Sequence, residues 1–525
     1  MTPAIDITTA QRKTLLTLLR QFIPGVLVWA YGSRAKWTAR PNSDLDLVAF
    51  TTPVQNPRVS ELKEALAESN LPFPVDVHVW DEVPERFHKI IRNEYVVLQE
   101  AEEKQLRSVS EWREGTIADV AAPSKNALVG GPFGSNLVSR DYTPSGVPVI
   151  RGQNMGFGRW VSGEFVFVSE DKAEDLSANI ARPGDLVFTQ RGTLGQVAIV
   201  PPASFDRYII SQSQMKLTVD PAKADTKFLF YFFTSEEQQD YIRRNAIQTG
   251  VPHTNLGHLR TTPLLLPPLP EQRAIAAVLG ALDDKIELNR RMNETLEALA
   301  QSLFKSWFVD ATQSALPKGW RESVLSECCE NIFSGGTPST QAADYWGGDI
   351  PWLSSGETRN RFIIDTEKTI TSLGVENSST RPARAGSTVI ASAGQGHTRG
   401  QTSLLTFDSY INQSVVVLVA DKSVSSDLFL FFDLARRYEQ FRAMSDSQSS
   451  RGSLTTKLLA EMKVVVPPRE LISKFDETVT PMTKKIIANL HESRTLAALR
   501  DALLPKLLSG ELRVPTQTKS EIWLK

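Results

Sequence analysis

The sequence LLLPPLPEQ at residues 264–272 is matched 200 positions later by VVVPPREL at residues 464–471. In each case an apolar run of strand character meets two prolines, and a long run of mostly helix-forming residues follows. Proline is tolerated in the first turn of a helix, where its missing N–H would have no partner. The pattern therefore predicts, in both halves of the chain, a strand that stops at the prolines and a long helix that starts there.

Both predicted helices carry apolar residues at spacings of three and four, which places these residues along one seam. An amphipathic helix lying on its own domain would also show a seam. Two matched helices, one per repeat, pack more naturally on each other, and we expect an antiparallel coiled coil of about 35–38 residues per helix, or about 50–55 Å. The seam residues are Ile275, Leu279, Leu282, Ile286, Leu296, Leu299 and Leu303 in the first helix and Phe475, Val479, Met482, Ile486, Leu496, Leu499 and Leu503 in the second.

Asn289 and Asn489 occupy equivalent positions in these seams. A polar residue in an apolar seam lowers the stability of a helix pair but fixes its register, because one alignment lets the polar groups meet. We therefore expect Asn289 and Asn489 to set the register of the coiled coil.

The repeat extends outward from the helices at a period of about 200 residues, which indicates two copies of one structural unit. RPGDLVFTQRGTLG at 182–195 is matched by RAGSTVIASAGQG at 384–396, and EWREGTIADV at 111–120 by GWRESVLSEC at 319–328. Each half runs from a Trp-Arg start through strand-like segments to Pro-Pro and a long helix. We predict two related lobes at opposite ends of a helical rod, and the rod would set the distance between two binding sites.

These motifs resemble the specificity subunit of type I restriction-modification enzymes over residues 108–525, about four fifths of the chain. The resemblance implies a subunit without an active site or cofactor of its own that reads a bipartite site in double-stranded DNA. It also implies two partner methyltransferase subunits, which methylate adenine with S-adenosylmethionine, and motor-nuclease subunits that join this core. The resemblance rests on RPGDLVFTQRGTLG, on GVPHTNLGHLRTTPLLLPPLPEQRAIAAVL at 250–279 and on LDDKIELNRRMNETLEALAQSLFKSWFVD at 282–310.

Loop residues of each lobe are candidates for reading bases. Arg pairs with guanine, and Asn or Gln with adenine, through two hydrogen bonds in the major groove. The alternative for each candidate is a solvated loop residue or a phosphate contact, and the recurrence of Arg182 and Arg384 before a turn favours a structural role for those two. The candidates are Arg151, Gln153, Asn154, Gln190 and Arg191 in the first lobe and Glu357, Arg359, Gln395, His397 and Arg399 in the second.

A different kind of motif, YGSRAKWTARPNSDLDL at 31–47, lies between two strand-like runs near the N-terminus. Gly32 lets backbone approach a phosphate, and Ser33 can donate a hydrogen bond to it, best at a helix N-terminus. Asp44 and Asp46 are two apart, so on a strand both carboxylates face one side. Two carboxylates can hold Mg²⁺ against a triphosphate, and Asp76, in the strand-like PVDVHVW, could join them.

This order of features resembles a minimal nucleotidyltransferase, a small α/β domain. The resemblance implies Asp44, Asp46 and Asp76 as metal-binding and catalytic residues, with Asp76 as third ligand or general base, Gly32 and Ser33 as nucleotide-binding residues, and Mg²⁺ and a nucleoside triphosphate as cofactor and substrate. Relatives of this type often transfer AMP to a partner protein. The family commonly has glycine where this chain has Trp37. The alternative is a Gly-Ser turn followed by two solvent-facing aspartates.

The composition is that of an ordinary globular protein of several domains. Its 58 Lys and Arg against 60 Asp and Glu give a net charge of −2, so any affinity for DNA must come from placed side chains or from partners. The two cysteines, Cys328 and Cys329, are adjacent and form neither a disulfide framework nor a zinc site, which fits a reducing cytoplasm. No signal peptide or membrane-spanning run is recognisable, so no membrane partner is expected.

The whole sequence thus predicts a mixed α/β (α+β) fold: a small nucleotidyltransferase-like α/β domain, then two α/β target-recognition domains separated by two long helices that form an antiparallel coiled coil. The rival hypothesis is a protein-modifying nucleotidyltransferase, regulatory or antitoxin-like, that uses the repeats to dock on a methylase complex. The predicted segments are 1–106 (nucleotidyltransferase-like), 107–265 (first target-recognition domain), 266–312 (first long helix), 313–465 (second target-recognition domain), 466–514 (second long helix) and 515–525 (tail).

Overall fold

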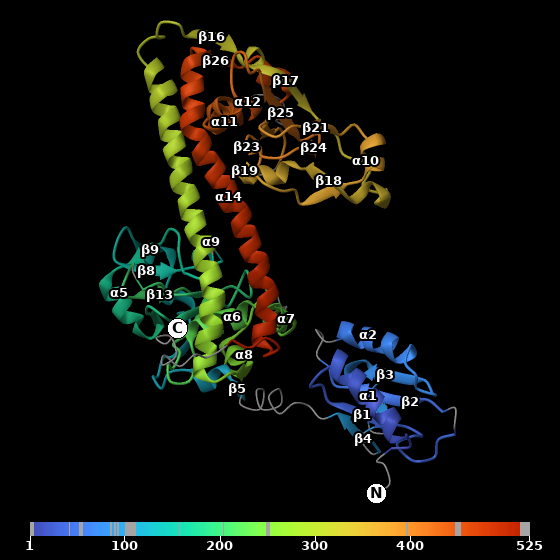
Figure 1. Cartoon of the computed structure of the whole chain (residues 1–525). Helices are drawn as coiled ribbons and strands as arrows, with labels where there is room; N and C mark the ends of the chain where they lie inside the picture. The colour runs from blue at the N-terminus through green and yellow to red at the C-terminus, as the bar shows by residue number, and fades with distance from the viewer. Residues whose placement is uncertain are drawn as a thin grey trace, which may run out of the picture. The chain divides into compact units, whose positions relative to one another are not determined.

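The mixed α/β class is confirmed by a computed structural model of the chain (Figure 1). Two compact units form, Met1–Gly280 with Asp501–Lys525 and Ala281–Arg500, and their boundary falls within the two long helices. The predicted tail at 515–525 lies outside the described residues. The structure describes residues 5–40, 43–51, 56–84, 87–88, 91, 94–99, 112–156, 158–202, 204–247, 252–394, 397–446 and 453–514.

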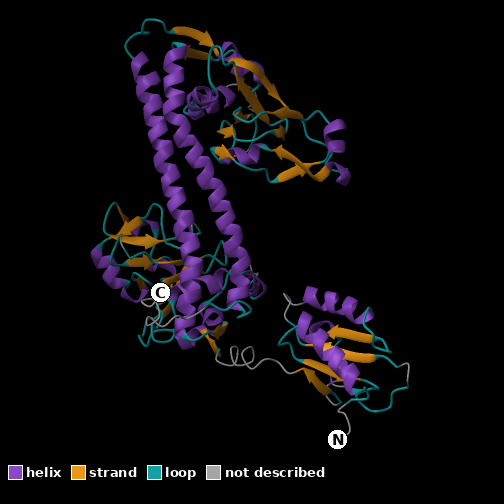
Figure 2. Cartoon of the chain, viewed as in Figure 1, coloured by secondary structure: helices purple, strands orange, loops and turns teal. Residues whose placement is uncertain are grey.

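The N-terminal domain is a four-stranded sheet in the order β3-β2-β1-β4 with helices α1 and α2 packed on one face (Figure 2). Thr8 begins α1 with a capping box, since its side chain accepts from the backbone of Gln11 and the Gln11 side chain accepts in return. Leu15 and Leu19 of α1 are buried against Leu47 and its neighbours in the sheet. The elements are α1 (Thr9–Phe22), β1 (Val28–Tyr31), β2 (Leu45–Ala49), α2 (Asn56–Ala67), β3 (Val75–Val79) and β4 (Val96–Gln99).

The first lobe contains a five-stranded sheet, β10-β13-β8-β9-β7, and a four-stranded sheet, β12-β11-β14-β6, while β15 pairs with β5. Its elements are β5 (Arg113–Thr116), β6 (Leu128–Gly130), β7 (Tyr142–Thr143), β8 (Val147–Ile150), β9 (Val166–Val168), α5 (Glu170–Asp175), β10 (Ile180–Ala181), β11 (Leu186–Thr189), β12 (Val197–Ile199), β13 (Tyr208–Ile210), β14 (Gln214–Leu217), α6 (Thr226–Thr234), α7 (Glu236–Arg244), α8 (Leu256–Thr261) and β15 (Pro263–Leu266).

The second lobe also has one five-stranded sheet, β17-β25-β22-β23-β19, and one four-stranded sheet, β20-β18-β24-β21, and β16 pairs with β26. Its elements are β16 (Arg321–Val324), β17 (Cys329–Ser334), β18 (Trp346–Leu353), β19 (Phe362–Ile363), β20 (Lys368–Ile370), α10 (Ser372–Glu376), β21 (Arg381–Ala383), β22 (Thr388–Ala391), β23 (Thr402–Leu405), β24 (Ser409–Ile411), β25 (Val415–Ala420), α11 (Asp427–Ala435), α12 (Tyr438–Asp446), α13 (Thr456–Ala460) and β26 (Lys463–Val466).

Each lobe leads through Pro-Pro into a long helix, as the sequence predicts. Helix α9 (Leu269–Phe304) has 36 residues and continues as a π-helical turn, and α14 (Arg469–Leu508) has 40 residues. Lys285 forms an ion pair with Glu492 at 3.1 Å, and further along α9 Asn293 donates to the carbonyl of Ile486 at 3.4 Å. Residue numbers rise on one helix while they fall on the other, so the two helices are antiparallel.

Two asparagines at the centre of the helix pair are fully buried. Asn289 Nδ2 donates to Glu492 Oε2 at 2.9 Å and to Ser493 Oγ at 3.3 Å, and Asn489 Nδ2 donates to Asn293 Oδ1 at 2.8 Å. Both central asparagines have an exposed fraction of 0%. Each asparagine thus reaches the residue four positions beyond its counterpart on the other helix, which is the pattern that a local twofold relation between the repeats would give.

The apolar seam follows a different path from the one predicted at Leu299. The Leu299 side chain is 46% exposed, whereas Ala300 is 1% exposed and packs in a cluster with Phe304 and Phe475. Ala300 lies four residues before Phe304, and an α-helix of 3.6 residues per turn keeps such residues on one face. The equivalent Leu499 is also 46% exposed, so both repeats present one leucine outside the seam.

The end of α14 is fastened to the start of the first lobe. Arg513 Nε lies 2.6 Å from Glu271 Oε1 in an ion pair, and the indole Nε1 of Trp112 donates to Glu271 Oε2 at 3.2 Å. Glu271 is 4% exposed, so its charge depends on these partners. At the equivalent position the second repeat has Leu471, which packs beside Phe475 in an aromatic cluster.

We expect Arg513→Ala to loosen the end of α14, because it leaves the buried Glu271 carboxylate without its cation, at a cost of about 2 kcal/mol. Hydrogen exchange of the backbone amides around Leu504 and Leu507 measures this local opening. The matched control is Arg494→Ala within α14, since the ion pair of Arg494 with Asp365 is about half exposed and should contribute less than about 1 kcal/mol. Adding Glu271→Leu to Arg513→Ala should restore most of the protection, and equal exchange in Arg513→Ala and wild type would contradict the assigned role.

Candidate functional site

Two of the three predicted metal ligands, Asp46 and Asp76, lie on the face of the N-terminal sheet opposite α1 and α2. On β2 the buried Leu45 and Leu47 point to the helices, so Asp46 between them points the other way. Asp46 is in register with Asp76 on the parallel strand β3 and with Tyr31 on the antiparallel strand β1. The exposed Asp44 immediately precedes β2. The fold therefore brings Asp46 and Asp76 onto neighbouring strands of one open face, and Asp44 lies two residues before Asp46 in the chain.

Gly32 lies directly against this acidic group. Its φ is +79°, a left-handed conformation that favours glycine, and an added Cβ would overlap the carboxylate of Asp46. Ser33 follows in a tight turn in which Thr38 N–H donates to the Ser33 carbonyl at 3.0 Å and Lys36 N–H to the Gly32 carbonyl at 3.2 Å. The Gly-Ser pair therefore lies in a turn and not at the start of an α-helix. A helix N-terminus would be the better phosphate site.

The electrostatics of the face reflect its concentration of negative charge. The pKa of Asp46 is raised, first by burial and then by repulsion from Asp76 and Asp44, while His78 lowers it. Burial together with the same Asp46 and Asp76 charges raises the pKa of Tyr31 to about 12. A bound cation would relieve this repulsion. The described residues hold no ready group of three His, Cys, Asp or Glu side chains around one point, so phosphate oxygens would have to complete a metal site.

Arg34 and Trp37 lie in the loop between β1 and β2, beside this site. The sequence did not indicate a structural role for Arg34, and it indicated Trp37 only as a departure from the family. Arg34, 5% exposed, donates to the carbonyls of Ser43 at 2.9 Å and Asp6 at 3.0 Å and lies 3.8 Å from the Phe73 ring, so it anchors the loop between β1 and β2. Trp37 has φ 59° and a 47% exposed side chain, and among the described residues it is the non-glycine residue with positive φ. A backbone that suits glycine thus carries an indole, at a cost of about 1 kcal/mol.

An aromatic cluster lies further along the open face of the same sheet. Trp29 stacks on Tyr95 with ring centroids 3.7 Å apart, and Trp80 stacks on Phe50 at 4.8 Å and on His88 at 4.1 Å. Sequence reasoning missed this cluster, although the alternation of Trp29 and Tyr31 with buried neighbours is a signal that could have found it.

In the first lobe, the structure separates the predicted base-reading residues into two groups. Asn154 is fully buried, since its Nδ2 donates to the carbonyls of Ser162 and Glu164 and its Oδ1 accepts from Arg151 N at 3.0 Å. Gln153 and Arg191 are exposed, whereas Arg151 and Gln190 are half-buried. Asn154 therefore stabilises its own turn. Arg151, Gln153, Gln190 and Arg191 remain the candidates for contact with a ligand.

The second lobe repeats this division. Glu357, 3% exposed, accepts from the backbone N–H groups of Ser354 and Glu367, both at 2.7 Å, so it caps a turn as Asn154 does. Arg359 and His397, from separate loops, line one hollow with Arg361 and Tyr438. Arg399 forms an ion pair with Asp446, Arg384 forms one with Asp427, and Gln395 lies outside the described residues.

Comparison with known proteins gives two families for two parts of the chain. Residues 110–298 and 317–492 match the type I restriction modification DNA specificity domain, and residues 14–104 match the polymerase beta nucleotidyltransferase model. The type I restriction enzyme HindI specificity subunit of Haemophilus influenzae is 23% identical over 481 residues, covering 77% of this chain and all of that protein. The crystal structure of the type I restriction-modification S subunit from M. genitalium, 20% identical, covers 78% of this chain and 97% of that one with a TM-score of 0.51, which shows a common fold.

The N-terminal domain has its own relative. A probable protein adenylyltransferase, MntA of Haemophilus influenzae, is 42% identical over 99 residues, which are 19% of this chain and 87% of that protein. The chain therefore belongs to the type I restriction-modification specificity family and carries at its N-terminus a domain of the polymerase beta nucleotidyltransferase family.

Proposed function

We propose that the two lobes read the two halves of a bipartite site in double-stranded DNA and so direct adenine methylation and cleavage by partner subunits. The observation that carries this proposal is the duplication itself: each lobe has one five-stranded and one four-stranded sheet and leads into one helix of an antiparallel pair. Two related readers on one rod match two half-sites at a fixed spacing.

The polar contacts at the centre of the helix pair support the same reading. The reciprocal hydrogen bonds of Asn289 and Asn489 favour one register, and a fixed register gives a fixed length of rod. The 36 and 40 residues of α9 and α14 correspond to about 54 and 60 Å of helix. The spacing between half-sites would then follow from helix length.

Equivalent surfaces on the two repeats suit two copies of one partner. Leu299 and Leu499 are exposed to the same degree, outside the buried seam. Since each repeat presents the same side chain, two methyltransferase subunits could bind in the same way, with S-adenosylmethionine on those subunits. Motor-nuclease subunits would bind the complex that results.

For the N-terminal domain, the proposal is transfer of a nucleotide from a nucleoside triphosphate to a partner protein. Asp44 and Asp46 would hold Mg²⁺, with Asp76 as third ligand or general base. Gly32 and Ser33 would approach the phosphates through their turn. Bound Mg²⁺ would neutralise triphosphate charge. The raised pKa of Asp46 and the close fit of Gly32 against its carboxylate support this assignment.

A second candidate function is a protein-modifying nucleotidyltransferase that uses the repeats to dock on a methylase complex. The 42% identity of the N-terminal domain to MntA is the observation that favours it. DNA binding by the purified complex, with and without residues 1–106, separates the two, because the rival predicts no sequence-specific binding in either case.

The first prediction concerns the lobes. Replacing residues 108–262 with the corresponding residues of a relative should change one half of the methylated motif and leave the other half intact, because each lobe reads one half-site. Methylome sequencing of cells that express the chain with its methyltransferase gives the motif. A change in both halves together would contradict two independent readers.

The second prediction concerns the rod. Inserting one heptad in each of α9 and α14 adds about 10 Å, from 1.5 Å per residue, and DNA rises 3.4 Å per base pair, so the spacer should grow by about three base pairs. The control replaces a heptad by another of the same length and should keep the spacer. An active insertion variant with an unchanged spacer would rule out the helices as the measure of distance.

The third prediction concerns the acidic face. Asp44→Asn with Asp46→Asn keeps side-chain size but removes two charges from the metal site, so transfer of label from ATP to a partner protein should fall to background. Adenine methylation should continue, since no residue before about 108 is assigned to DNA reading. Equal labelling by wild type and variant would remove the metal role. If neither labels, Trp37→Gly, which restores the residue common in the family, should produce transfer, and failure of that variant as well would contradict catalysis by this domain.

A further inference from the structure

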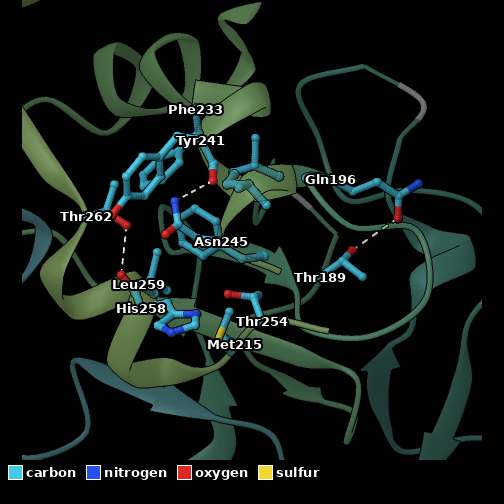
Figure 3. Close-up of a pocket in the computed structure, with 14 residues that line it drawn as sticks. Thr189, Gln196, Met215, Phe233, Tyr241, Asn245, Thr254, His258, Leu259 and Thr262 are labelled. Atoms are coloured by element: carbon cyan, nitrogen blue, oxygen red, sulfur yellow. Dashed lines mark hydrogen bonds between the residues drawn. The ribbon is translucent and has the colours of Figure 1, made fainter. Parts of the chain in front are cut away.

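A small cavity lies inside the first lobe, between the β11-β14 sheet and helices α7 and α8 (Figure 3). It measures ≈ 30 Å³ for the centres of water-sized groups, and about 10–15 Å³ suffices for one water, so it has room for two or three waters. His258 lines this space, and its buried Nδ1 makes no hydrogen bond among the described residues. A base or another ring does not fit here, so the candidates for contact with DNA are the loops at the surface of the lobe.

The second lobe is filled with apolar side chains at the equivalent place. Thr254 N–H donates to the Gln190 carbonyl at 3.0 Å, and Leu454 N–H donates to the Ser392 carbonyl at 3.0 Å, so Thr254 and Leu454 are equivalent. Leu454 is buried in one cluster with apolar neighbours. The interiors of the lobes thus differ by the room for a few waters.

One surface loop of the first lobe presents a large apolar side chain to solvent. Phe133, in the loop that follows β6, is 90% exposed, and the next most exposed large apolar side chain among the described residues is Leu288 at 53%. Single exposed apolar residues are common on protein surfaces, so exposure alone assigns no role. Phe133 differs from an ordinary surface residue in the way its loop is held and in where that loop lies.

The loop is fixed so that Phe133 points away from the rest of the lobe. Leu137 is buried, and Asn136 N–H donates to the Phe133 carbonyl at 3.0 Å, which closes a tight turn. The Gln212 side chain donates to the carbonyls of Gly134 and Leu137 and so ties this turn to the loop between β13 and β14. Because the turn is already ordered, binding through Phe133 restricts little further backbone.

The loop also lies at the edge of the sheets that carries candidate base-reading residues. Gly131, two residues before Phe133, packs on the Ser211 carbonyl, since an added Cβ would overlap this group. A Cβ added at the glycine before Gly131 would lie 3.8 Å from Gln190 Oε1. Ser211 N–H donates to the carbonyl of the residue before Arg151 at 3.0 Å. Phe133 therefore belongs to the same edge of the lobe as Gln190 and Arg151.

Buried polar groups at this edge lack partners in the part of the chain that the structure describes. Gln214 is fully buried and its Nε2 makes no hydrogen bond, and Arg151 Nε is also buried without one. A Cβ added at Gly152 would lie 3.9 Å from Gln214 Nε2, so Gln214 lies beside the turn that begins at Arg151. Such groups lower stability, and their presence favours an edge that a polar ligand completes.

The second lobe has a polar residue in place of Phe133. Strands β6 and β17 pair with the equivalent strands β14 and β25, and the two pairings place Ser334 where the first lobe has Gly130. Three residues further along, Thr337 corresponds to Phe133. Thr337 is half-buried, and its hydroxyl donates to the side chain of Gln413. The apolar tip is therefore a feature of the first lobe at this position and not of the second.

A base-pair step suits this edge better than the surface of another protein does. The core of a protein interface is a patch of several apolar side chains, with about 800 Å² buried on each partner. Phe133 instead presents one ring beside polar side chains. Apolar side chains that enter a base step partly unstack it and bend the duplex, and an aromatic ring can then stack on the bases.

We propose that Phe133 inserts between two base pairs of the half-site that the first lobe reads and bends the DNA there, whereas the second lobe, with Thr337, leaves its half-site stacked. Arg151 and Gln190 would contact base edges beside the opened step. Pyrimidine–purine steps unstack most easily, so we expect one within or next to the first half-site. This inference rests on the proposed function of the lobes, because it requires that they bind DNA.

The test uses the full chain in complex with its methyltransferase subunits and duplexes that carry its methylated motif. Two dyes on either side of the half-site assigned to the first lobe by the lobe exchange report bending by energy transfer, and a second duplex carries the dyes around the other half-site. Binding of the wild type should raise energy transfer across the first half-site only. Phe133→Ala should abolish that rise and increase the Kd by about fivefold or more, the scale of one aromatic ring stacked on a base, and Phe133→Trp should retain both.

The matched control is Leu373→Ala, which removes an exposed apolar side chain from the second lobe and should leave bending and Kd unchanged. Since the Phe133 side chain is exposed, Phe133→Ala should keep the thermal midpoint of the wild type. Sequence-specific binding with equal bending by wild type and Phe133→Ala would overturn the inserted ring but not the proposed function. Loss of methyltransferase binding by Phe133→Ala with bending retained would also overturn it, in favour of a protein contact. A wild type that binds its motif no better than other DNA would contradict the proposed function, and the inserted ring with it.

Discussion

The architecture of residues 112–514 depends on the antiparallel contact of α9 and α14 around two buried asparagines. Apolar seams alone would allow several alignments of similar stability, whereas the hydrogen bonds that Asn289 and Asn489 donate across the helix pair require one alignment. The polar pair lowers the stability that an all-leucine seam would give. In return it fixes which parts of the two helices meet.

The start of each long helix is held to its own lobe by a different kind of interaction. Glu271 with Arg513 and Trp112 makes a buried charged contact at one junction, and Leu471 with Phe475 and Phe308 makes an apolar one at the other. A charged contact requires its partners, since a buried carboxylate without a cation is strongly unfavourable. An aromatic cluster tolerates small shifts better. The repeats therefore share a fold but have diverged where the side chains are buried as well as in their loops.

The same divergence is visible inside the lobes and on the N-terminal sheet. The first lobe keeps polar groups around a cavity at the place where the second lobe is packed with Leu454, Phe441 and Met462. On the N-terminal sheet, Asp46 is held half-buried beside other acids with Gly32 against it. The acidic arrangement lowers stability, and such arrangements persist most readily where a ligand uses them.

The sequence by itself determined the elements whose signals are local. The Pro-Pro starts, the seam spacing and the repeat predict α9, α14 and two related lobes, and Gly-Ser followed by Asp-x-Asp predicts the acidic face of a small sheet. These follow because periodicity and turn chemistry act over a few residues. Tertiary structure alone decided which polar loop residues are buried. Asn154 and Glu357 read as base contacts from their type, yet each caps a turn, because backbone groups distant in sequence complete their hydrogen bonds.

Tertiary structure also decided which face of a helix the partner covers and which spaces stay open. Leu299 has the spacing of a seam residue, but Ala300 occupies the seam, where it is buried in one cluster with Phe304 of α9 and Phe475 of α14. The unpartnered nitrogen of His258 and the cavity around it arise where α7, α8 and the β11-β14 sheet meet. Packing between segments far apart in the chain determines such features. A sequence pattern does not indicate how much space is left between these segments.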